Sequence, residues 1–137
     1  MPAPAPDAFV VRVAEDVDVV VARQKGREMA QQLGLAGTDL TLIATAISEI
    51  ARNIVNYAGR GEIRFAPTKA GGRTGIEIVA TDEGPGIADI ELAMRDGYST
   101  GKSLGLGLPG ARRLMDEFAI QSTVGSGTTV TMTKWIK

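Results

Sequence analysis

Three polar side chains at helical spacing are the first candidates for chemistry in this sequence. Glu49, Asn53 and Asn56 stand at i, i+4 and i+7 of TDLTLIATAISEIARNIVNYAG, so a helix would place them on one face. The carbonyl oxygen of Asn53 is a hard ligand that suits Mg²⁺, which binds phosphates through few protein groups. Glu49 could accept a proton from a nearby water or hydroxyl. A lone pattern of this kind is more often a solvated helix face.

The stretch DEGPGI provides a second candidate site. Asp82 stands at the end of a predicted strand, and Gly84 and Gly86 allow the backbone to approach a ligand at angles that other residues resist. The Asp82 carboxylate only accepts hydrogen bonds and could bind the exocyclic amine of adenine. Because Asp-x-Gly-x-Gly is also a common structural turn, this motif is not decisive alone.

The glycine-rich stretch GYSTGKSLGLGL is a third candidate, although it is not a P-loop. Three residues separate its first glycine, Gly97, from Gly-Lys-Ser, whereas a P-loop needs four. The preceding ADIELAMRD also predicts a short helix rather than a buried strand. Gly105 and Gly107 come before a helix predicted to start near Leu108, and backbone N–H groups at a helix start suit a phosphate.

Further polar side chains could complete a phosphate site. Lys102 and the hydroxyls of Ser99, Thr100 and Ser103 could close over the bound group. Near the end of the chain, Thr128 follows the turn GSG and could donate to a phosphate oxygen. By itself Thr128 is simply a strand residue.

Local sequence patterns predict the elements that would hold these residues. A strand is predicted over AFVVRVA, and a helix begins near Val17 and stops at Gly34 and Gly37. The next helix has Thr38 as its predicted N-cap and Gly59 just past its end. Its isoleucines form one apolar stripe at positions Ile43, Ile47, Ile50 and Ile54. The polar face with the candidate residues would therefore line a cleft at the edge of the core.

The second half of the chain predicts two hairpins around another helix. GEIRFAPT and GIEIVATD form the first hairpin, with Gly71 and Gly72 in its turn. LPGARRLMDEF is predicted to be a helix, and AIQSTV and TTVTMTKWIK form the last hairpin. This order predicts an α+β fold, a two-layer α/β sandwich with a mostly antiparallel mixed sheet and helices on one face. Residues 1–7 are predicted to be a disordered leader, and residues 8–137 a single domain.

Composition excludes several classes of function. The 137 residues are 44% hydrophobic and 23% charged, as in a globular domain, and the net charge of −1 gives no basis for sequence-blind nucleic-acid binding. Without Cys or His, thiol catalysis, imidazole bases and most transition-metal sites are excluded. No apolar run approaches the roughly 20 residues of a membrane span. These features predict a cytoplasmic protein without nucleic-acid or membrane partners.

Together, the four motifs resemble those of the GHKL ATPase superfamily, which has the Bergerat ATP-binding fold. Their order is Glu-x-x-x-Asn on a helix, Asp-x-Gly-x-Gly after a strand, Gly-x-Gly before a helix and Gly-Thr on a final hairpin. The resemblance extends over roughly residues 8 to 135. It implies that GYSTGKSLGLGL is the ATP lid with the second glycine box.

Within that superfamily, SEIARNIVNYAGRGEI and LGLGLPGARRLMDEF are similar to the RsbT-type serine/threonine switch kinases of bacterial stress signalling. This resemblance implies a kinase that uses ATP and Mg²⁺. Its expected substrates are STAS-domain scaffold or antagonist proteins of the stressosome. The kinase would then act on a downstream partner, a phosphatase or another output enzyme.

The resemblance also implies residue roles. Glu49 would be the general base, Asn53 would hold Mg²⁺, and Asp82 would recognise adenine. The expected nucleotide-binding residues are Asn53, Asn56, Asp82, Gly84, Gly86, Lys102, Gly105, Gly107 and Thr128. The role of Lys102 as a cation for the γ-phosphate rests only on its position in the lid.

Other functions remain compatible with the same motifs. An anti-sigma-like module would use the ATP pocket only to gate partner affinity, without phosphate transfer. A histidine-kinase catalytic domain would need its phosphoacceptor in trans, since the chain has no His. A degenerate member would no longer bind nucleotide, but all four motifs are intact. The presence of Glu49 favours catalysis over gating.

Overall fold

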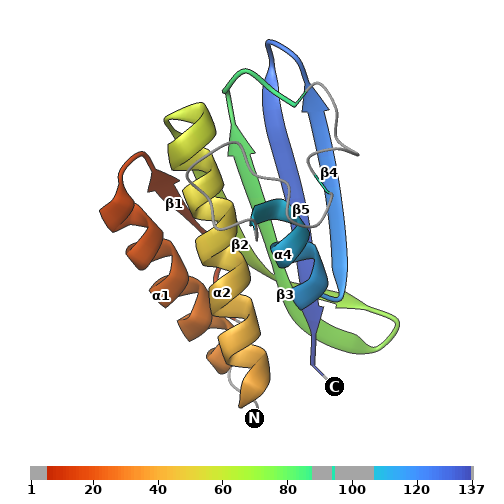
Figure 1. Ribbon diagram of the computed structural model, residues 1–137. Helices are drawn as coiled ribbons and strands as arrows, with labels where there is room; N and C mark the ends of the chain where they lie inside the picture. Colours follow the sequence, from red (N-terminus) through yellow and green to blue (C-terminus); the bar gives the residue numbers. More distant parts are fainter. Residues whose placement is uncertain (1–5, 88–93, 95–106, 137) are drawn as a thin grey trace.

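The computed structural model describes residues 6–87, Met94 and residues 107–136 of the chain. Its elements form a sheet with helices on one side (Figure 1). In chain order they are β1 (Phe9–Val13), α1 (Asp16–Leu33), α2 (Thr38–Asn53), the π-helix η1 (Ile54–Ala58), β2 (Gly61–Ala70), β3 (Arg73–Asp82), α4 (Gly107–Leu114), β4 (Glu117–Thr123) and β5 (Gly127–Trp135). The predicted helix ADIELAMRD lies outside the described residues, apart from Met94.

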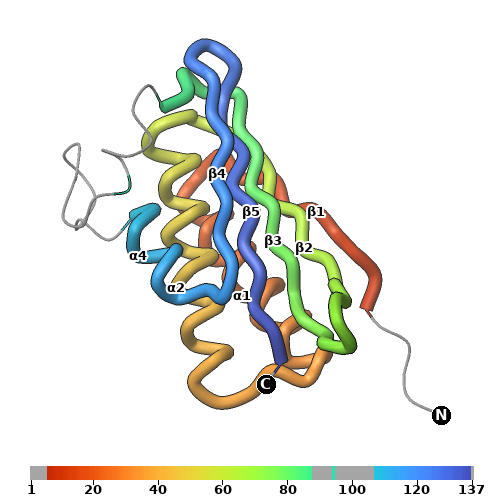
Figure 2. The backbone as a smooth tube through the Cα atoms, turned by 90° about the vertical axis from the view of Figure 1, so that its right-hand side faces the viewer, coloured from red at the N-terminus to blue at the C-terminus, as the bar shows by residue number. Residues whose placement is uncertain are grey.

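The sheet has five strands in the order β1-β2-β3-β5-β4. All pairs are antiparallel, and no parallel pair occurs in the described part of the chain. In two views at right angles, the helices cover one face of the sheet and leave the other face open (Figure 2). The predicted two-layer sandwich with a mostly antiparallel sheet is therefore confirmed.

The predicted isoleucine stripe of α2 faces the core. All four of its side chains are 2% exposed or less, and they belong to one cluster with the inward-facing residues of the sheet: Ile43, Ile47, Ile50 and Ile54. Gly26 brings α1 close to this layer, because a Cβ at that position would lie 2.6 Å from Cε1 of Phe65. The apolar face holds α2 firmly and leaves its polar face free for chemistry.

Helix α1 begins and ends with local hydrogen bonds that explain its limits. The Asp18 carboxylate accepts the N–H groups of Ala14 and Glu15, at 2.9 and 3.0 Å, and these bonds lower the pKa of Asp18. At the other end, Gly34 adopts a left-handed φ of 109° and Leu35 N donates to Ala30 O at 3.0 Å. The predicted stop at Gly34 is confirmed.

Helix α2 differs from the prediction at both ends. Thr38 is already the first helical residue, and its N-cap is Gly37, whose φ of 59° suits glycine. The prediction of Thr38 as the N-cap is therefore wrong by one position. At the far end the chain widens into η1, where Gly59 N donates to Ile54 O at 2.8 Å, a bond across five residues. The α-helical pattern did not predict this π-turn, although Gly59 does follow the helix end.

The last helix is shorter than predicted. LPGARRLMDEF was expected to be helical throughout, but α4 ends at Leu114 and β4 begins at Glu117. Asp116 N donates to Thr133 O at 3.0 Å, and Glu117 then pairs with Thr133 in β5. Pairing with the long strand β5 therefore outweighs the local helical preference of Glu117 and its neighbours.

Candidate functional site

A polar row crosses one end of the sheet on its helix-covered face. The pairing register aligns Gly61, Asp82, Thr128 and Ser122 across β2, β3, β5 and β4. Directly paired residues project from the same face of a sheet. Asp82 lies two residues beyond the buried Ala80, and the adjoining row is apolar. The polar groups therefore lie at the edge of the hydrophobic core, at this end of the sheet.

Asp82 has one carboxylate oxygen available for a ligand. Its Oδ1 accepts the N–H of Gly84 at 2.9 Å, which forms a short turn at the strand end. Within the described chain, Oδ2 has no hydrogen bond, and the residue is half-buried. Asp82 can therefore accept one further donor from a bound molecule.

The glycines of DEGPGI are required by packing inside the protein. A Cβ at Gly84 would lie 2.6 Å from the Cβ of Ala58, so Gly84 lets η1 approach the end of β3. Gly86 has a φ of 78°, and a Cβ there would collide with the backbone of Thr123 in β4. Their backbone contacts with a nucleotide stay predictions.

Glu49 and Asn53 share one face of α2 and have free acceptor groups. Glu49 Oε1 pairs with Arg52 Nη1 at 3.1 Å, and the side chains are 15% and 54% exposed respectively. In the described part of the chain, Glu49 Oε2 and the Asn53 amide have no hydrogen-bond partner. A carboxylate and an amide oxygen are therefore accessible one helical turn apart.

Asn56 does not continue that face in the predicted way. It lies in η1, whose wider turn rotates the chain less per residue than an α-helix, and its side chain is exposed. The spacing i+7 therefore no longer places Asn56 directly above Glu49. Its contact with the nucleotide stays a prediction.

The structure describes only part of the region that is expected to bind the phosphates. Gly107 is the first residue of α4, which packs beside α2 with Ala111 fully buried. The N–H groups of its first turn suit an anion. Lys102, Gly105 and the hydroxyls of Ser99, Thr100 and Ser103 lie outside the described residues.

Thr128 lies at the Asp82 end of this region. It is the cross-strand partner of Asp82, and its Oγ1 lies 2.8 Å from Ser122 Oγ. Its predicted bond to a phosphate oxygen is untested. The register favours a role beside Asp82 instead.

The side chains fit Mg²⁺ better than a metal with many protein ligands. No group of three or more Asp, Glu, His or Cys residues able to hold a metal occurs in the described part of the chain. A metal at Asn53 would take its other ligands from phosphate oxygens and water, as Mg²⁺ commonly does.

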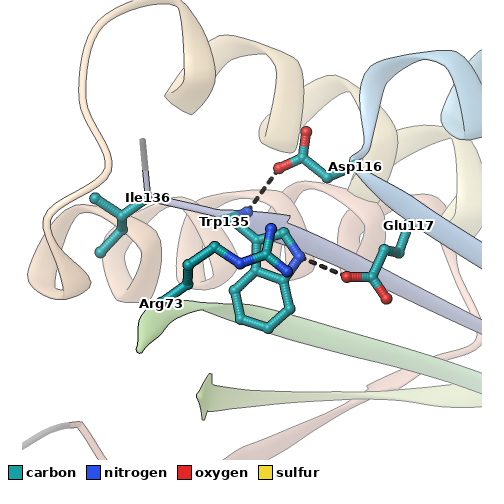
Figure 3. A pocket seen from close by; sticks show the side chains of 5 residues that line it. All are labelled: Arg73, Asp116, Glu117, Trp135 and Ile136. Carbon is teal, nitrogen blue, oxygen red and sulfur yellow. Dashed lines mark hydrogen bonds between the residues drawn. The ribbon is translucent and has the colours of Figure 1, made fainter. Parts of the chain in front are cut away.

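A hollow of about 320 Å³ lies at the opposite end of the sheet (Figure 3). The Arg73 guanidinium stacks 4.4 Å from the Trp135 ring centroid, and Trp135 Nε1 donates to Glu117. Asp116 Oδ2 accepts the backbone N–H of Trp135 at 2.8 Å. This hollow contains none of the predicted nucleotide-binding residues.

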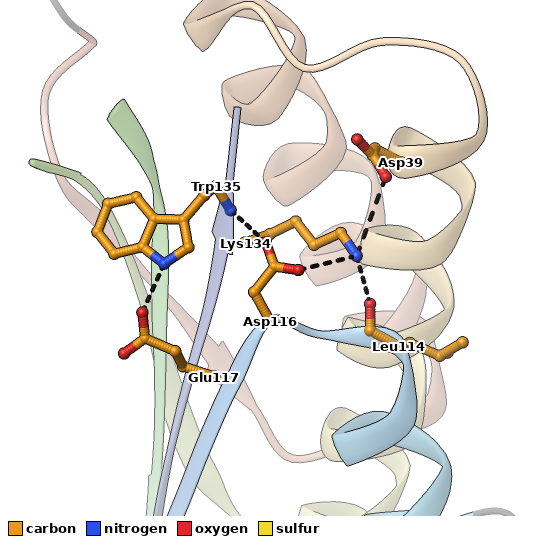
Figure 4. Close-up of polar contacts among 6 residues, drawn as sticks. All are labelled: Asp39, Leu114, Asp116, Glu117, Lys134 and Trp135. Atoms are coloured by element: carbon orange, nitrogen blue, oxygen red, sulfur yellow. Dashed lines mark hydrogen bonds and ion pairs between the residues drawn. The ribbon is translucent and has the colours of Figure 1, made fainter. Parts of the chain in front are cut away.

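Lys134 of β5 contacts residues of both α2 and α4 (Figure 4). Its side chain is only 6% exposed, and its Nζ donates to Leu114 O at 2.8 Å. Nζ also lies 3.9 Å from Asp39 Oδ1 and 3.8 Å from Asp116 Oδ1. The ammonium therefore sits at the negative end of α4, where a cation is favourable. This contact fixes the helix whose other end begins at Gly107.

Replacing Lys134 with methionine is expected to lower the free energy of unfolding by about 1–3 kcal/mol, because Leu114 O loses its donor. Urea unfolding measures the change. Lys69→Met, at an exposed position of β2, is the matched control and should stay within about 0.5 kcal/mol of the native chain. Equal stability of the two variants would contradict the role of Lys134.

Two structural residues, Ser122 and Lys134, were missed in the sequence. Both occupy helix-facing strand positions that otherwise hold apolar side chains, as Phe118 and Ile120 do before Ser122. A polar residue in an apolar alternation is the signal that could have found them. Their partners could not be found in this way, because these lie on other elements.

Comparisons with known proteins agree with the geometry. The histidine kinase-like ATPase domain family matches residues 12–134. The serine/threonine-protein kinase RsbT of Bacillus subtilis is 48% identical over 131 residues, 96% of this chain and 98% of that protein. The anti-sigma F factor of a Thermoanaerobacter species is 36% identical over 121 residues, 84% of this chain and 83% of that protein.

Among solved structures, the mycobacterial sensor histidine kinase MprB is similar with a TM-score of 0.57. The match covers 93% of this chain and 96% of that chain at 15% identity, so it supports the fold alone. Of the helices that the structure describes, none has the length and apolar character needed to cross a membrane.

Proposed function

Since the chain belongs to the histidine kinase-like ATPase domain family, we propose that it works as an ATP-dependent serine/threonine-protein kinase in bacterial stress signalling. The near full-length similarity to a kinase of this specificity supports the proposal. The observation that best supports phosphate transfer is the accessible Glu49 carboxylate, one helical turn from Asn53. The π-helix that continues α2 packs against the turn that follows Asp82.

In the proposed complex, the adenine base lies at the polar row and the phosphates extend toward α4. Asp82 Oδ2 accepts a hydrogen bond from the exocyclic amine of the base. The first-turn N–H groups of α4, beginning at Gly107, donate to phosphate oxygens. Gly84 and Gly86 keep the turn thin enough for the base to approach.

Phosphate transfer then depends on how the protein positions the reacting groups and neutralises the charge on the phosphate oxygens. Glu49 Oε2 takes the proton of the substrate Ser or Thr hydroxyl, whose oxygen forms a bond to the γ-phosphorus while the bond to ADP breaks. Asn53 would hold Mg²⁺, which neutralises charge on the phosphate oxygens when it is bound. Arg52 pairs with the other oxygen of Glu49 and so orients the carboxylate.

The kinase acts on protein partners, and we propose a specific class for them. Its substrates are STAS-domain scaffold or antagonist proteins of the stressosome, in the cytoplasm. After transfer it acts on a downstream phosphatase or output enzyme. The similarity to a serine/threonine-protein kinase and to anti-sigma factors supports a role in a signalling network made of proteins.

A nucleotide-gated binding module is the second candidate. The 36% identity to an anti-sigma F factor favours it, because gating needs the same pocket. A histidine-kinase role in trans has weaker support, since the likeness to MprB concerns the fold alone.

Incubation with radiolabelled ATP, Mg²⁺ and purified STAS-domain proteins separates these functions. The proposal predicts acid-stable label in Ser or Thr of the partner. Acid-labile label would indicate phosphohistidine and would overturn the proposed specificity. Nucleotide-dependent binding of the partner without any label would identify a gated module.

A further inference from the structure

Ser122 occupies the end of the polar row and has three polar neighbours. Ile87 N donates to Ser122 Oγ at 2.7 Å. Gly127 O lies 3.1 Å away, and Thr128 Oγ1 lies 2.8 Å away. Ile87 follows directly on the DEGPG turn, whereas Gly127 and Thr128 are the first two residues of β5, the strand beside Asp82.

The single proton of Ser122 determines the direction of these bonds. A hydroxyl has one donor and two acceptor lone pairs. Gly127 O can only accept, so Ser122 must donate to it, while Ile87 N–H takes one lone pair. The remaining contact is satisfied only if Thr128 donates its proton to Ser122. This arrangement alone makes all three hydrogen bonds at once.

Thr128 then offers only lone pairs to a ligand. Its neighbour across the strands, Asp82, is also an acceptor, through the free Oδ2. Paired side chains on one face lie about 4.5–5.5 Å apart at Cβ. Two acceptors at this spacing suit a ligand group with two N–H donors and disfavour a carbonyl oxygen.

The same serine fixes the wall of this pocket. Beside its bond from Ile87, Gly125 N donates to Pro85 O at 2.9 Å. Gly127 has a φ of 100° and lies so close to the Asp82 backbone that a Cβ would collide with it. The β4–β5 turn and the DEGPGI turn therefore form one continuous surface next to Asp82.

We propose that Ser122 is a positioning residue that holds Thr128 as a hydrogen-bond acceptor, so that the pocket selects a purine with an amino group at position 6. This inference rests on the proposed binding of ATP. It assigns Thr128 to recognition of the base rather than of a phosphate. Ser122 itself acts through Thr128 and through the turn at Ile87.

The test compares ATP with ITP, which has a carbonyl oxygen in place of the amine. Ser122→Ala frees the Thr128 proton, and the affinity ratio of ATP to ITP is expected to fall about tenfold, the value of roughly one hydrogen bond. Gln121→Ala, the exposed neighbour on the other face of β4, is the control and should keep the native ratio. Ser122→Thr retains the hydroxyl and should also keep the native affinity ratio of ATP to ITP.

A double-mutant cycle distinguishes positioning from a general loss of packing. In a Thr128→Val background, Ser122→Ala is expected to leave the ATP to ITP ratio unchanged, because Thr128 no longer has a proton to orient. A further fall in that background, or a native ratio in Ser122→Ala alone, would overturn the inference. A native chain that binds neither nucleotide would instead overturn the proposed function. If Ser122→Ala does not fold, Thr128→Val and Thr128→Ser decide the matter: only the valine variant should lower the ratio.

Discussion

The Glu49→Gln variant is expected to transfer phosphate about 10²–10⁴ times more slowly than the native protein, because glutamine cannot accept the substrate proton. Nucleotide affinity should hardly change, since the carboxylate belongs to the transfer step rather than to the base pocket. The lost ion pair with the exposed Arg52 contributes little to stability. Initial rates of labelling and a nucleotide titration measure the two effects separately.

Glu62→Gln provides the control for this change. Glu62 is an exposed glutamate of β2, and it alternates with the buried Ile63, so its side chain projects from the face of the sheet opposite to α2. Its variant should keep the native rate. Full activity in Glu49→Gln would contradict the role of Glu49 as the general base of phosphate transfer.

The Asp82→Asn variant is expected to bind ATP about 10–150 times more weakly, the value of a hydrogen bond to a charged group. The asparagine oxygen can still accept the N–H of Gly84, so the turn should keep its shape. Its amide nitrogen, however, would present donors to the exocyclic amine of the base. Equilibrium titration with ATP measures the loss.

Glu83→Gln is the matched control, because Glu83 is the exposed neighbour of Asp82 in the same turn. It removes the same charge without removing an acceptor from the polar row. If both variants lost affinity equally, the effect would be one of general charge, and the role of Asp82 in recognising adenine would be wrong.

The fold was largely predictable because most of its helices, strands and turns have recognisable local sequence patterns. The stripe that begins at Ile43 identifies the buried face of α2, and Gly71 and Gly72 both have the positive φ that a tight hairpin turn requires. The errors lie where distant residues decide. Pairing with β5 ends α4 before Glu117, and the η1 turn packs against the Asp82 end of β3.

The candidate site was predictable as a set of residue types, and less so as geometry. Spacing placed Glu49 and Asn53 together, and the strand end placed Asp82 beside two glycines. Sequence could not show that Thr128 pairs with Asp82, because β4 lies between the two strands in the chain. Nor could it give the partners of Ser122, which lie on two other segments, at Ile87 and at the start of β5.

The most direct test of this account is a calorimetric titration of the purified protein with ATP or ADP and Mg²⁺ at two temperatures, so that a small enthalpy at one temperature does not conceal binding. We expect one nucleotide to bind per chain, with weaker binding in Asp82→Asn. No heat of association at millimolar nucleotide at either temperature would contradict the proposal that α2 and the polar row enclose an adenine nucleotide.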